Sequence, residues 1–325
     1  MKKFLKVFFS ILGILVLVVI IAWTALDISK YILYSDYYDG YARACAIPDI
    51  HSGFTPQGIT YLPDSDAYLQ SGYDGEHLAL YYVKGKDQRK LLPLDMSGAL
   101  GKGHGGGVTA TDKYVYIAGD SALLRYDLAT VLAAKAGDRI PCLEEIKVDN
   151  NAAFCFADGD KLYVGEFYRA GNYETDMTHA FKTPEGEEHR AIVSCYTIEE
   201  SGTLKAQPDL RISVPGLVQG FAIHNGVIAI SRSWGLNSSS LEFYNGMLDS
   251  GVAVTDDEGA YTSVPLYYIG QKNRIRQMDI PAFSEDLTVQ GDRVVINFES
   301  ACNKYIVGKL FFATDAGSYP FPKAQ

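Results

Sequence analysis

The chain repeats one strand–turn–strand pattern five times, and this repeat limits the possible fold more than any other feature. Each copy has a small or polar pair of residues, a short apolar run, a turn and a second apolar run. Two of the turns are Asp158-Gly159 and Asn225-Gly226. Such a dipeptide between apolar runs is the strongest local signal for a β-hairpin, because both residues tolerate positive φ. The copies begin at Gln57, Gly106, Ala152, Gln219 and Glu285.

The second apolar run of each copy is rich in β-branched and aromatic residues, as in Tyr114-Val115-Tyr116-Ile117 and Val294-Val295-Ile296. It barely alternates with polar residues, which is typical of a strand covered on both faces. The repeats are 46 to 67 residues apart. A four-stranded propeller blade takes about 40–50 residues, so the longer steps leave room for insertions. The sequence therefore predicts an all-β fold, a five-bladed β-propeller, with six or seven blades as the alternative.

The first 26 residues form a separate segment. Three lysines within the first six residues precede an uncharged run from Val7 to Leu26. This run matches the ~20 residues needed to cross a bilayer and exceeds the ~7–15 of a cleavable signal core. We predict an uncleaved signal anchor, a single transmembrane helix over 1–26 with a cytoplasmic N-terminus. A cleaved signal peptide is the alternative, and both place the propeller outside the cytoplasm.

A stalk rich in tyrosine occupies residues 27–50, and the propeller occupies 51–325. We expect the outer strands of blades four and five at 261–267 and 309–314, which leaves the fifth blade one strand short. An open sheet edge promotes aggregation, and ring propellers close by letting one terminus complete the blade of the other. The predicted donor is Tyr41–Ile47.

Charge limits the possible partners of the propeller. After the anchor, 26 basic residues stand against 39 acidic ones, a net charge of −13. A domain this acidic repels phosphate backbones, so nucleic acid is not an expected partner. It also repels anionic lipid headgroups. We therefore expect contact with the membrane only through the N-terminal helix.

The five cysteines contain no C-x-x-C pair, so neither a thiol-redox motif nor a thiolate zinc site is indicated. Cys155 and Cys195 lie in apolar runs and are expected in the core. An odd number of cysteines outside the cytoplasm leaves at least one unpaired. Cys45 and Cys302 could form a disulfide if the stalk pairs with the last blade.

Two short motifs match catalytic patterns only in spelling. Gly101-Lys102-Gly103-His104-Gly105-Gly106 satisfies G-x-G-x-x-G, but a dinucleotide site needs a helix next, and a strand pattern follows here. We interpret these glycines as letting backbone pack close to the propeller axis. Ser231–Gly235 lacks the first glycine of a nucleophile elbow, and no helical pattern follows it.

Candidate site residues follow from propeller geometry, in which the first strand of each blade lies at the axis and the loops at one end form a funnel. The residues just before each innermost strand should converge there, together with the ends of the second strands. Trp234 could stack on a sugar or an aromatic ligand. The predicted ligand-binding residues are Gln57, His104, Glu166, Gln219, Ser231, Trp234, Glu285 and Glu299.

Three carboxyl groups suggest chemistry in the funnel. Glu285, Asp286 and Glu299 could bind a hard cation such as calcium through oxygen ligands, or two of them could act as an acid–base pair. Alternatively, they cap strand ends and accept hydrogen bonds from backbone amides. His104 has three glycine neighbours that leave its ring accessible, so His104, Glu285 and Glu299 are the catalytic candidates. The insertion from Tyr168 to Arg190 is either a lid or a solvated loop.

Five ordered motifs support a family resemblance. They are PQGITYLPDSDAYLQSGYD from Pro56, GHGGGVTA from Gly103, FADGDKLYVGEF from Phe156, LVQGFAIHNGVIAISRSWGLNSSSLEFY from Leu217 and IPAFSEDLTVQGDRVVINFESACNKY from Ile280. This set resembles a family of secreted or membrane-anchored bacterial propeller proteins, mostly from Gram-positive bacteria, in the quinoprotein-like propeller superfamily. The resemblance covers nearly everything after the stalk. It implies the fold and the location, and no established reaction.

A more remote resemblance involves the start of blade one. FTPQGI from Phe54 is similar to the FTQG-type opening of plant and bacterial glutaminyl cyclotransferases, which are five-bladed propellers, with Pro56 inserted. The F-G-E-G motif that supplies the catalytic glutamate of that family falls on His104-Gly105-Gly106-Gly107. Gly106 therefore stands where the glutamate would be, and the resemblance implies the fold.

Two functions fit the sequence. The first is a binding or interaction module of the cell envelope that takes a small ligand or an envelope peptide in its funnel, since propellers often serve as rigid platforms. The alternative is an enzyme of the lyase, lactonase or glutaminyl cyclotransferase type. Two carboxylates close together in the funnel would favour the enzyme. A funnel plugged by Trp234 or Tyr305 would favour the interaction module.

Overall fold

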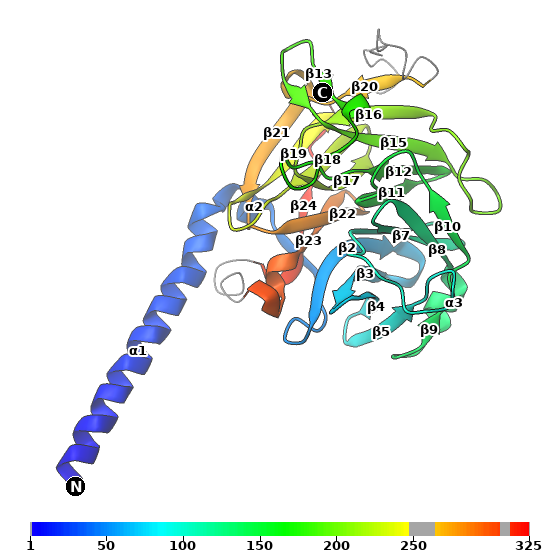
Figure 1. The fold of residues 1–325 in the computed structure, drawn as a ribbon. Coiled ribbons are helices and arrows are strands. Elements are labelled where there is room, and N and C mark those ends of the chain that lie inside the picture. The colour runs from blue at the N-terminus through cyan, green and yellow to red at the C-terminus, as the bar shows by residue number, and fades with distance from the viewer. Residues whose placement is uncertain (1, 247–263, 306–312, 325) are drawn as a thin grey trace.

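The structure is a computed structural model that describes residues 2–246, 264–305 and 313–324. Its strands form five large sheets around a centre, as Figure 1 shows. The innermost strands contact one another in a closed circuit, in the order β2, β6, β11, β17, β22 and back to β2. The predicted five-bladed propeller is therefore confirmed.

Each blade is built from consecutive antiparallel strands that lead from the axis to the rim. Blade one has β2 (Phe54–Leu62), β3 (Ala67–Asp74), β4 (His77–Lys84) and β5 (Asp87–Pro93). Blade two has β6 (Gly107–Ala110), β7 (Tyr114–Gly119), β8 (Ala122–Asp127) and β10 (Glu144–Lys147). Blade three has β11 (Phe154–Asp158), β12 (Lys161–Gly165), β15 (Ala191–Thr197) and β16 (Leu210–Val214). Blade four has β17 (Val218–His224), β18 (Val227–Arg232), β19 (Ser239–Asn245) and β21 (Arg274–Ile280).

Blade five is completed by the N-terminal part of the chain. It has β22 (Ser284–Gln290), β23 (Arg293–Phe298) and β24 (Asp315–Pro320), and β1 (Ala42–Ala46) forms its outer edge. β1 pairs antiparallel with β24, with Ala42 opposite Ser318 and Ala46 opposite Asp315. The predicted donor segment is therefore confirmed, because β1 lies within it.

The core lies between the blades. Tyr116 and Ile117 are neighbours in β7 and point to opposite faces of the sheet, yet both are fully buried. Tyr116 packs with Cys155 and Leu162 of blade three. Ile117 packs with Leu69 of blade one. Each inner strand is thus covered on both faces, as the apolar runs without alternation predicted.

The innermost strands meet at glycines. A Cβ atom added to Gly107 would lie 2.6 Å from the backbone N of Cys155 and 2.7 Å from the Cα of Phe154. One added to Gly220 would lie 2.7 Å from the Cα of Asp286. These neighbours are backbone atoms and cannot rotate away, so only glycine fits at these positions. Backbone therefore packs closely at the axis, as the glycine-rich stretch of blade two indicated.

The stalk is not a simple linker. Helix α1 (Lys2–Leu33) continues beyond the predicted anchor, and helix α2 (Ser35–Gly40) follows it. Tyr37 of α2 is buried and stacks on Tyr319, with their ring centroids 6.1 Å apart. Nη2 of Arg293 donates to the carbonyl of Gly40 over 2.6 Å. The second half of the stalk is therefore docked on the propeller, and α1 extends away from it (Figure 1).

Helix α1 is long and apolar enough to cross a membrane, by length and composition, and none of its residues is buried. This agrees with the predicted anchor. The structure itself contains no membrane, so the topology of the chain remains a prediction.

Two outer strands were assigned wrongly. Tyr267 lies in β20 (Leu266–Tyr268), which pairs in parallel with β16 at the rim of blade three, and β21 takes its expected place in blade four. The third strand of blade five is β24 and not 309–314, of which 309–312 lie outside the described residues. Short apolar runs near a rim fit either of two neighbouring sheets, so their composition could not distinguish the two.

The disulfide that Cys45 and Cys302 could have formed is not present, because all five cysteines are free. Cys45 is buried at the rim on β1, where its sulfur accepts a hydrogen bond from Gln70 over 3.3 Å. Cys155 and Cys195 are buried in the core, as expected.

Removing β1 should destabilise the ring. Deleting residues 2–26 leaves every blade intact, whereas deleting residues 2–47 leaves the edge of β24 unpaired and removes the buried Tyr37. We expect the shorter deletion to unfold at the temperature of the full chain and to be monomeric. The longer deletion should unfold at a lower temperature and aggregate. Size-exclusion chromatography and thermal unfolding measure both, and equal behaviour of the two deletions would contradict a closing role for β1.

Gly107→Ala should lower the free energy of unfolding by about 1–3 kcal/mol, the usual cost of forcing an extra carbon into packed structure. Gly119→Ala is a matched control in the next strand, since a Cβ there has no neighbour within 4 Å. The control should change stability by no more than about 0.5 kcal/mol. Denaturant unfolding measures the change in the free energy of unfolding for each variant. Equal changes in the two would contradict the conclusion that only glycine fits at position 107.

Candidate functional site

An open cavity of about 530 Å³ lies at one end of the ring and is lined by residues of all five blades. The five residues at which the repeats begin converge there, together with three other predicted ligand-binding residues. The cavity residues foreseen from the sequence are Gln57, His104, Gly106, Ala152, Gln219, Trp234, Glu285 and Glu299.

Irregular pairing in three inner strands aims side chains into this cavity. The register shifts between Pro56 and Ile59 of β2, between Val218 and Gly220 of β17, and between Ser284 and Leu287 of β22. The shifted segments contain Gln57, Gln219 and Glu285, respectively. A β-bulge leaves a residue outside the regular ladder and redirects its side chain, which is how these three reach the cavity.

Backbone strain is concentrated at the same end of the ring. Ala152, Leu217 and Phe283 have φ of 42°, 68° and 60°, and each lies one or two residues before an inner strand. Such left-handed conformations cost residues other than glycine about 1–2 kcal/mol each. They persist only where surrounding structure enforces them, and they cluster at functional sites. All three lie in consecutive blades at the end of the ring that carries the cavity.

Two carboxyl groups occupy the buried side of the cavity. Glu285 is 3% exposed, and Glu299, the first residue of the 3-10 helix η4 (Glu299–Ala301), is 8% exposed. Burial raises the pKa of Glu285 well above its ordinary value, and the neighbouring charges of Glu299 and Asp286 raise it further. Burial also raises the pKa of Glu299. This pair therefore favours holding at least one proton.

Lys304 offsets the charge of Glu299. It lies in the 3-10 helix η5 (Asn303–Tyr305), with Nζ 3.6 Å from Oε1 of Glu299, and it donates a hydrogen bond to the hydroxyl of Tyr73. Its Nζ also lies 5.1 Å from the ring centroid of Tyr73 and 5.3 Å from that of Tyr305. Burial opposes the charged form, but the bond to Tyr73 and the charge of Glu299 outweigh it and raise the pKa of Lys304. The ammonium group is therefore charged at neutral pH.

His104 is oriented by an aspartate. Its Nδ1 is 3.4 Å from Oδ1 of Asp120, and its ring stands edge-on to Tyr73 at 5.4 Å between centroids. The hydrogen bond to Asp120 raises the pKa of His104, and the same contact lowers the pKa of Asp120. The partner of His104 is thus a carboxylate. Its side chain is 61% exposed, which leaves it accessible from the cavity.

An aromatic wall, formed by Phe167, Tyr173 and Trp234, faces this polar group from blades three and four. Phe167 stacks on Trp234 with ring centroids 6.1 Å apart and 30° between the ring planes. Tyr173 stands edge-on to both at 5.3 and 5.9 Å. The guanidinium of Arg169 lies over Trp234, 4.0 Å from the ring centroid. Trp234 therefore lines the cavity wall and does not plug the axis.

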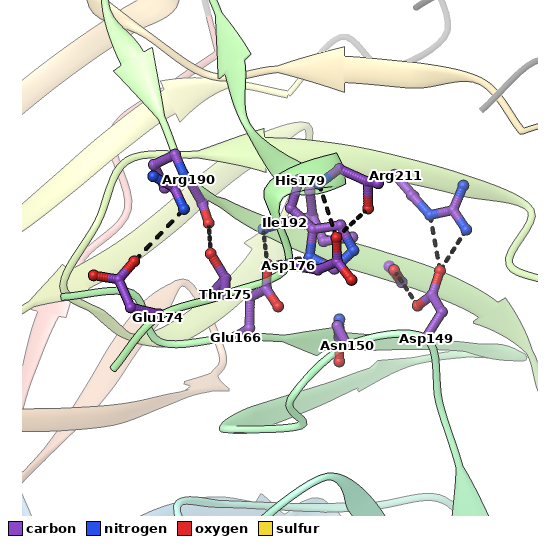
Figure 2. A network of polar contacts seen from close by, with 12 residues as sticks. Asp149, Asn150, Glu166, Glu174, Thr175, Asp176, His179, Arg190, Ile192 and Arg211 are labelled. Carbon is purple, nitrogen blue, oxygen red and sulfur yellow. Dashed lines mark hydrogen bonds and ion pairs between the residues drawn. The ribbon is translucent and has the colours of Figure 1, made fainter. Parts of the chain in front are cut away.

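Part of the long insertion of blade three belongs to the cavity, through Asn172, Tyr173 and Glu174. Figure 2 shows how the insertion is held. Nδ1 of His179 lies 2.7 Å from Oε1 of Glu166, and a carboxylate oxygen of Glu174 lies 3.6 Å from Arg190. The hydroxyl of Thr175 donates to the carbonyl of Arg190. These bonds fix the start of the insertion as a wall of the cavity.

Three predicted site residues lie outside the cavity lining and support it instead. Glu166 also accepts from the backbone N of Ile192 over 3.1 Å and is 1% exposed beneath the insertion. The hydroxyl of Ser231 donates to the carbonyl of Glu285. Asp286 accepts from the backbone N of Ile59 and of Val108, both over 3.2 Å. Asp286 therefore points to the axis, toward β2 and β6.

The predicted cation site is not formed by the residues proposed for it. Within 2–246, 264–305 and 313–324, no three or more His, Cys, Asp or Glu side chains are grouped so that they could hold a metal ion. Glu285 and Glu299 share the cavity, whereas Oδ2 of Asp286 is occupied by two backbone amides. The backbone-amide alternative therefore describes Asp286, and calcium has no support from the described side chains.

Several cavity residues were not foreseen from the sequence, including Tyr73, Asp120 and Lys304. Tyr73 lies at the end of β3, and Asp120 directly follows β7. The rule that selected Glu166, Ser231 and Glu299 at second-strand ends would have found both if it had been applied to blades one and two. Lys304 gave no such signal, because it lies in a short helical turn beyond its strand.

Comparisons with known proteins show no family for this chain. No family model matches it, and no curated protein matches it. A solved luciferin-regenerating enzyme is 9% identical with a TM-score of 0.43, covering 87% of this chain and 99% of its own. A gluconolactonase from Xanthomonas campestris is 11% identical with a TM-score of 0.38, covering 87% and 89%. A chain of a nidogen/laminin complex is 9% identical with a TM-score of 0.38, covering 76% and 73%. TM-scores this low carry no argument about activity.

Glu285→Gln should remove one pH-dependent part of the folding free energy. The folded-state pKa of Glu285 lies above the ~4.3 of an unfolded glutamate. Below about pH 4, Glu285 is neutral in both states and does not lower the free energy of unfolding. As the pH rises from there toward the folded-state pKa, only the unfolded state loses its proton, and the free energy of unfolding falls. We expect Glu285→Gln to gain stability over the unmodified protein between pH 4 and pH 8. Thermal unfolding across this range measures the gain. A difference that does not change with pH would contradict the raised pKa.

Proposed function

We propose that this chain is a membrane-anchored propeller outside the cytoplasm that binds a small ligand or peptide in the cavity at the end of its ring. In this proposal α1 is the single membrane span, with Lys2, Lys3 and Lys6 in the cytoplasm. The propeller is a rigid platform of the cell envelope, and its partners are the membrane, through α1, and the ligand.

One observation carries the proposal: all five blades contribute residues to one open cavity that contains buried carboxyls and an aromatic wall. Ligand sites are typically concave, with apolar and aromatic surface and a few polar groups at fixed positions. Titratable residues with perturbed pKa values in such a cleft also indicate a functional site. The buried Glu285, the raised pKa of Glu299 and the strained Phe283 before them meet these criteria.

A specific observation also favours a second function, an enzyme of the lyase, lactonase or cyclotransferase type. Glu285 and Glu299 have raised pKa values side by side, with charged Lys304 at 3.6 Å from one of them. A general acid or base works best when its pKa is near the working pH. In this function, neutral Glu285 would donate a proton to a leaving oxygen or nitrogen. Glu299 would accept one from water or from carbon, and Lys304 would stabilise developing negative charge.

Site variants with matched controls test the proposal. Sugars, lactones, amino acids and short peptides can be screened by thermal shift, and the affinity of each hit measured by calorimetry. Glu299→Gln and His104→Ala should weaken binding at least tenfold. His224→Ala and Glu200→Gln change the same residue types away from the cavity, at the last residue of β17 and in the turn after β15, and both should bind as the unmodified protein does.

Conversion of a hit, followed by mass spectrometry, separates the two functions. Turnover that Glu299→Gln abolishes while binding persists would establish the enzyme. Binding without turnover would support the binding module. Unchanged affinity and turnover in both Glu299→Gln and His104→Ala would show that the ligand site lies elsewhere.

A further inference from the structure

The charged side chains that line the cavity are paired with one another or with a close neighbour. His104 faces Asp120 at 3.4 Å, and Lys304 faces Glu299 at 3.6 Å. Glu174 lies 3.6 Å from Arg190, just behind the wall. Burial makes Glu285, the remaining acid, favour its neutral form. The lining therefore offers little net charge to an ionic ligand, in contrast to the acidic chain as a whole.

The uncharged polar side chains of the lining are both donors and acceptors. They are the amides of Gln57, Asn151, Asn172 and Gln219 and the hydroxyl of Ser121, from four of the five blades. The amide nitrogen of Gln57 also donates to the carbonyl of Pro56, and the amide oxygen of Asn172 accepts from Arg169, so these two amides keep only part of their capacity for a ligand. An amide carries two donor hydrogens and a carbonyl acceptor, and a hydroxyl carries one donor and two lone pairs. Such groups match ligand hydroxyls, which also donate and accept. A carboxylate ligand only accepts hydrogen bonds and an ammonium ligand only donates them, so either would leave the acceptors or the donors of the lining without a partner.

The aromatic wall adds a preference for a ligand with one apolar face. Phe167 and Trp234 lie nearly parallel, and Arg169 covers one face of Trp234. Tyr173 is 47% exposed at the edge of this group. An aromatic surface opposite hydrogen-bonding groups fits a molecule whose ring presents C–H bonds on its face and hydroxyls around its edge. A pyranose sugar has this distribution.

We infer that the ligand is a neutral saccharide, a pyranose mono- or disaccharide that lies against the aromatic wall, of which Tyr173 is the exposed ring, and is hydrogen-bonded by the amides of the lining. This inference rests on the proposed function of the cavity. It adds the chemical class of the ligand and assigns Gln219 and Trp234 to its recognition.

The chain provides its own reporter for this ligand. It has two tryptophans, Trp23 in α1 and Trp234 in the cavity. In full-length Trp23→Phe in detergent micelles, Trp234 is therefore the sole source of tryptophan fluorescence. The probes are two neutral disaccharides, maltose and N,N′-diacetylchitobiose, the anionic disaccharide of galacturonic acid, the cationic disaccharide of glucosamine, and blocked trialanine.

We expect at least one neutral disaccharide to change the emission of Trp234 with saturation, and both charged disaccharides to bind at least tenfold more weakly. Gln219→Leu in the Trp23→Phe background should lower the affinity for the neutral disaccharide at least tenfold. Gln207→Leu replaces an exposed glutamine in a loop of blade three and should not change its affinity. Thermal unfolding of both variants shows whether either substitution disturbs the fold.

The other outcomes overturn the inference in distinguishable ways. Tighter binding of a charged disaccharide or of trialanine would support ligand binding in the cavity but contradict its assignment to neutral sugars. An unchanged affinity in folded Gln219→Leu would remove the assigned recognition residue. If no probe changes the emission, the saccharide class is wrong. The thermal-shift screen then decides separately whether the cavity binds any small molecule.

Discussion

The close approach of inner strands at the axis is the contact on which the ring and its cavity depend. Gly107 and Gly220 lie so near the backbone of the next blade that a methyl group would overlap it. Beside them, the buried carboxyl of Asp286 in blade five accepts hydrogen bonds from Ile59 of blade one and Val108 of blade two. Three blades are thus joined by one side chain. This contact fixes the strand ends from which Gln57 and Glu285 project.

Ring closure connects the propeller to the segment that precedes it. β1 supplies the outer strand of blade five, and α2, directly before it, packs Tyr37 against Tyr319. Only eight residues, 34–41, therefore separate the end of α1 from a strand that the fold requires. If α1 lies in a membrane, the propeller is held close to it by a short, docked connection, and the ring cannot swing freely as it would on a flexible linker.

The cavity combines several features that cost folding free energy. Five residues other than glycine have positive φ in or beside it, namely Asp120, Ser121, Ala152, Leu217 and Phe283. Glu285 and Glu299 are buried there with raised pKa values. Strain and buried carboxyls are retained where function depends on them. Glu166 and Ser231 hold the surroundings in place, since one fixes the insertion through His179 and the other binds the carbonyl of Glu285. Glu166 and Ser231 are as deeply buried as the cavity carboxyls Glu285 and Glu299, so only their hydrogen bonds show that they support the cavity and do not line it.

The sequence by itself determined the architecture and the convergence of five positions. The repeated hairpins determined the number of blades, and the missing strand of blade five identified residues 41–47 as its donor. The order of strands then places Gln57, Gly106, Ala152, Gln219 and Glu285 at one end of the ring. The local sequence pattern predicts these positions because each repeated unit packs against the preceding and following units in the same way. Only the tertiary structure decided which way each side chain points. Register shifts aim Glu285 into the cavity and leave its neighbour Asp286 at the axis, and such shifts depend on contacts between blades rather than on local sequence.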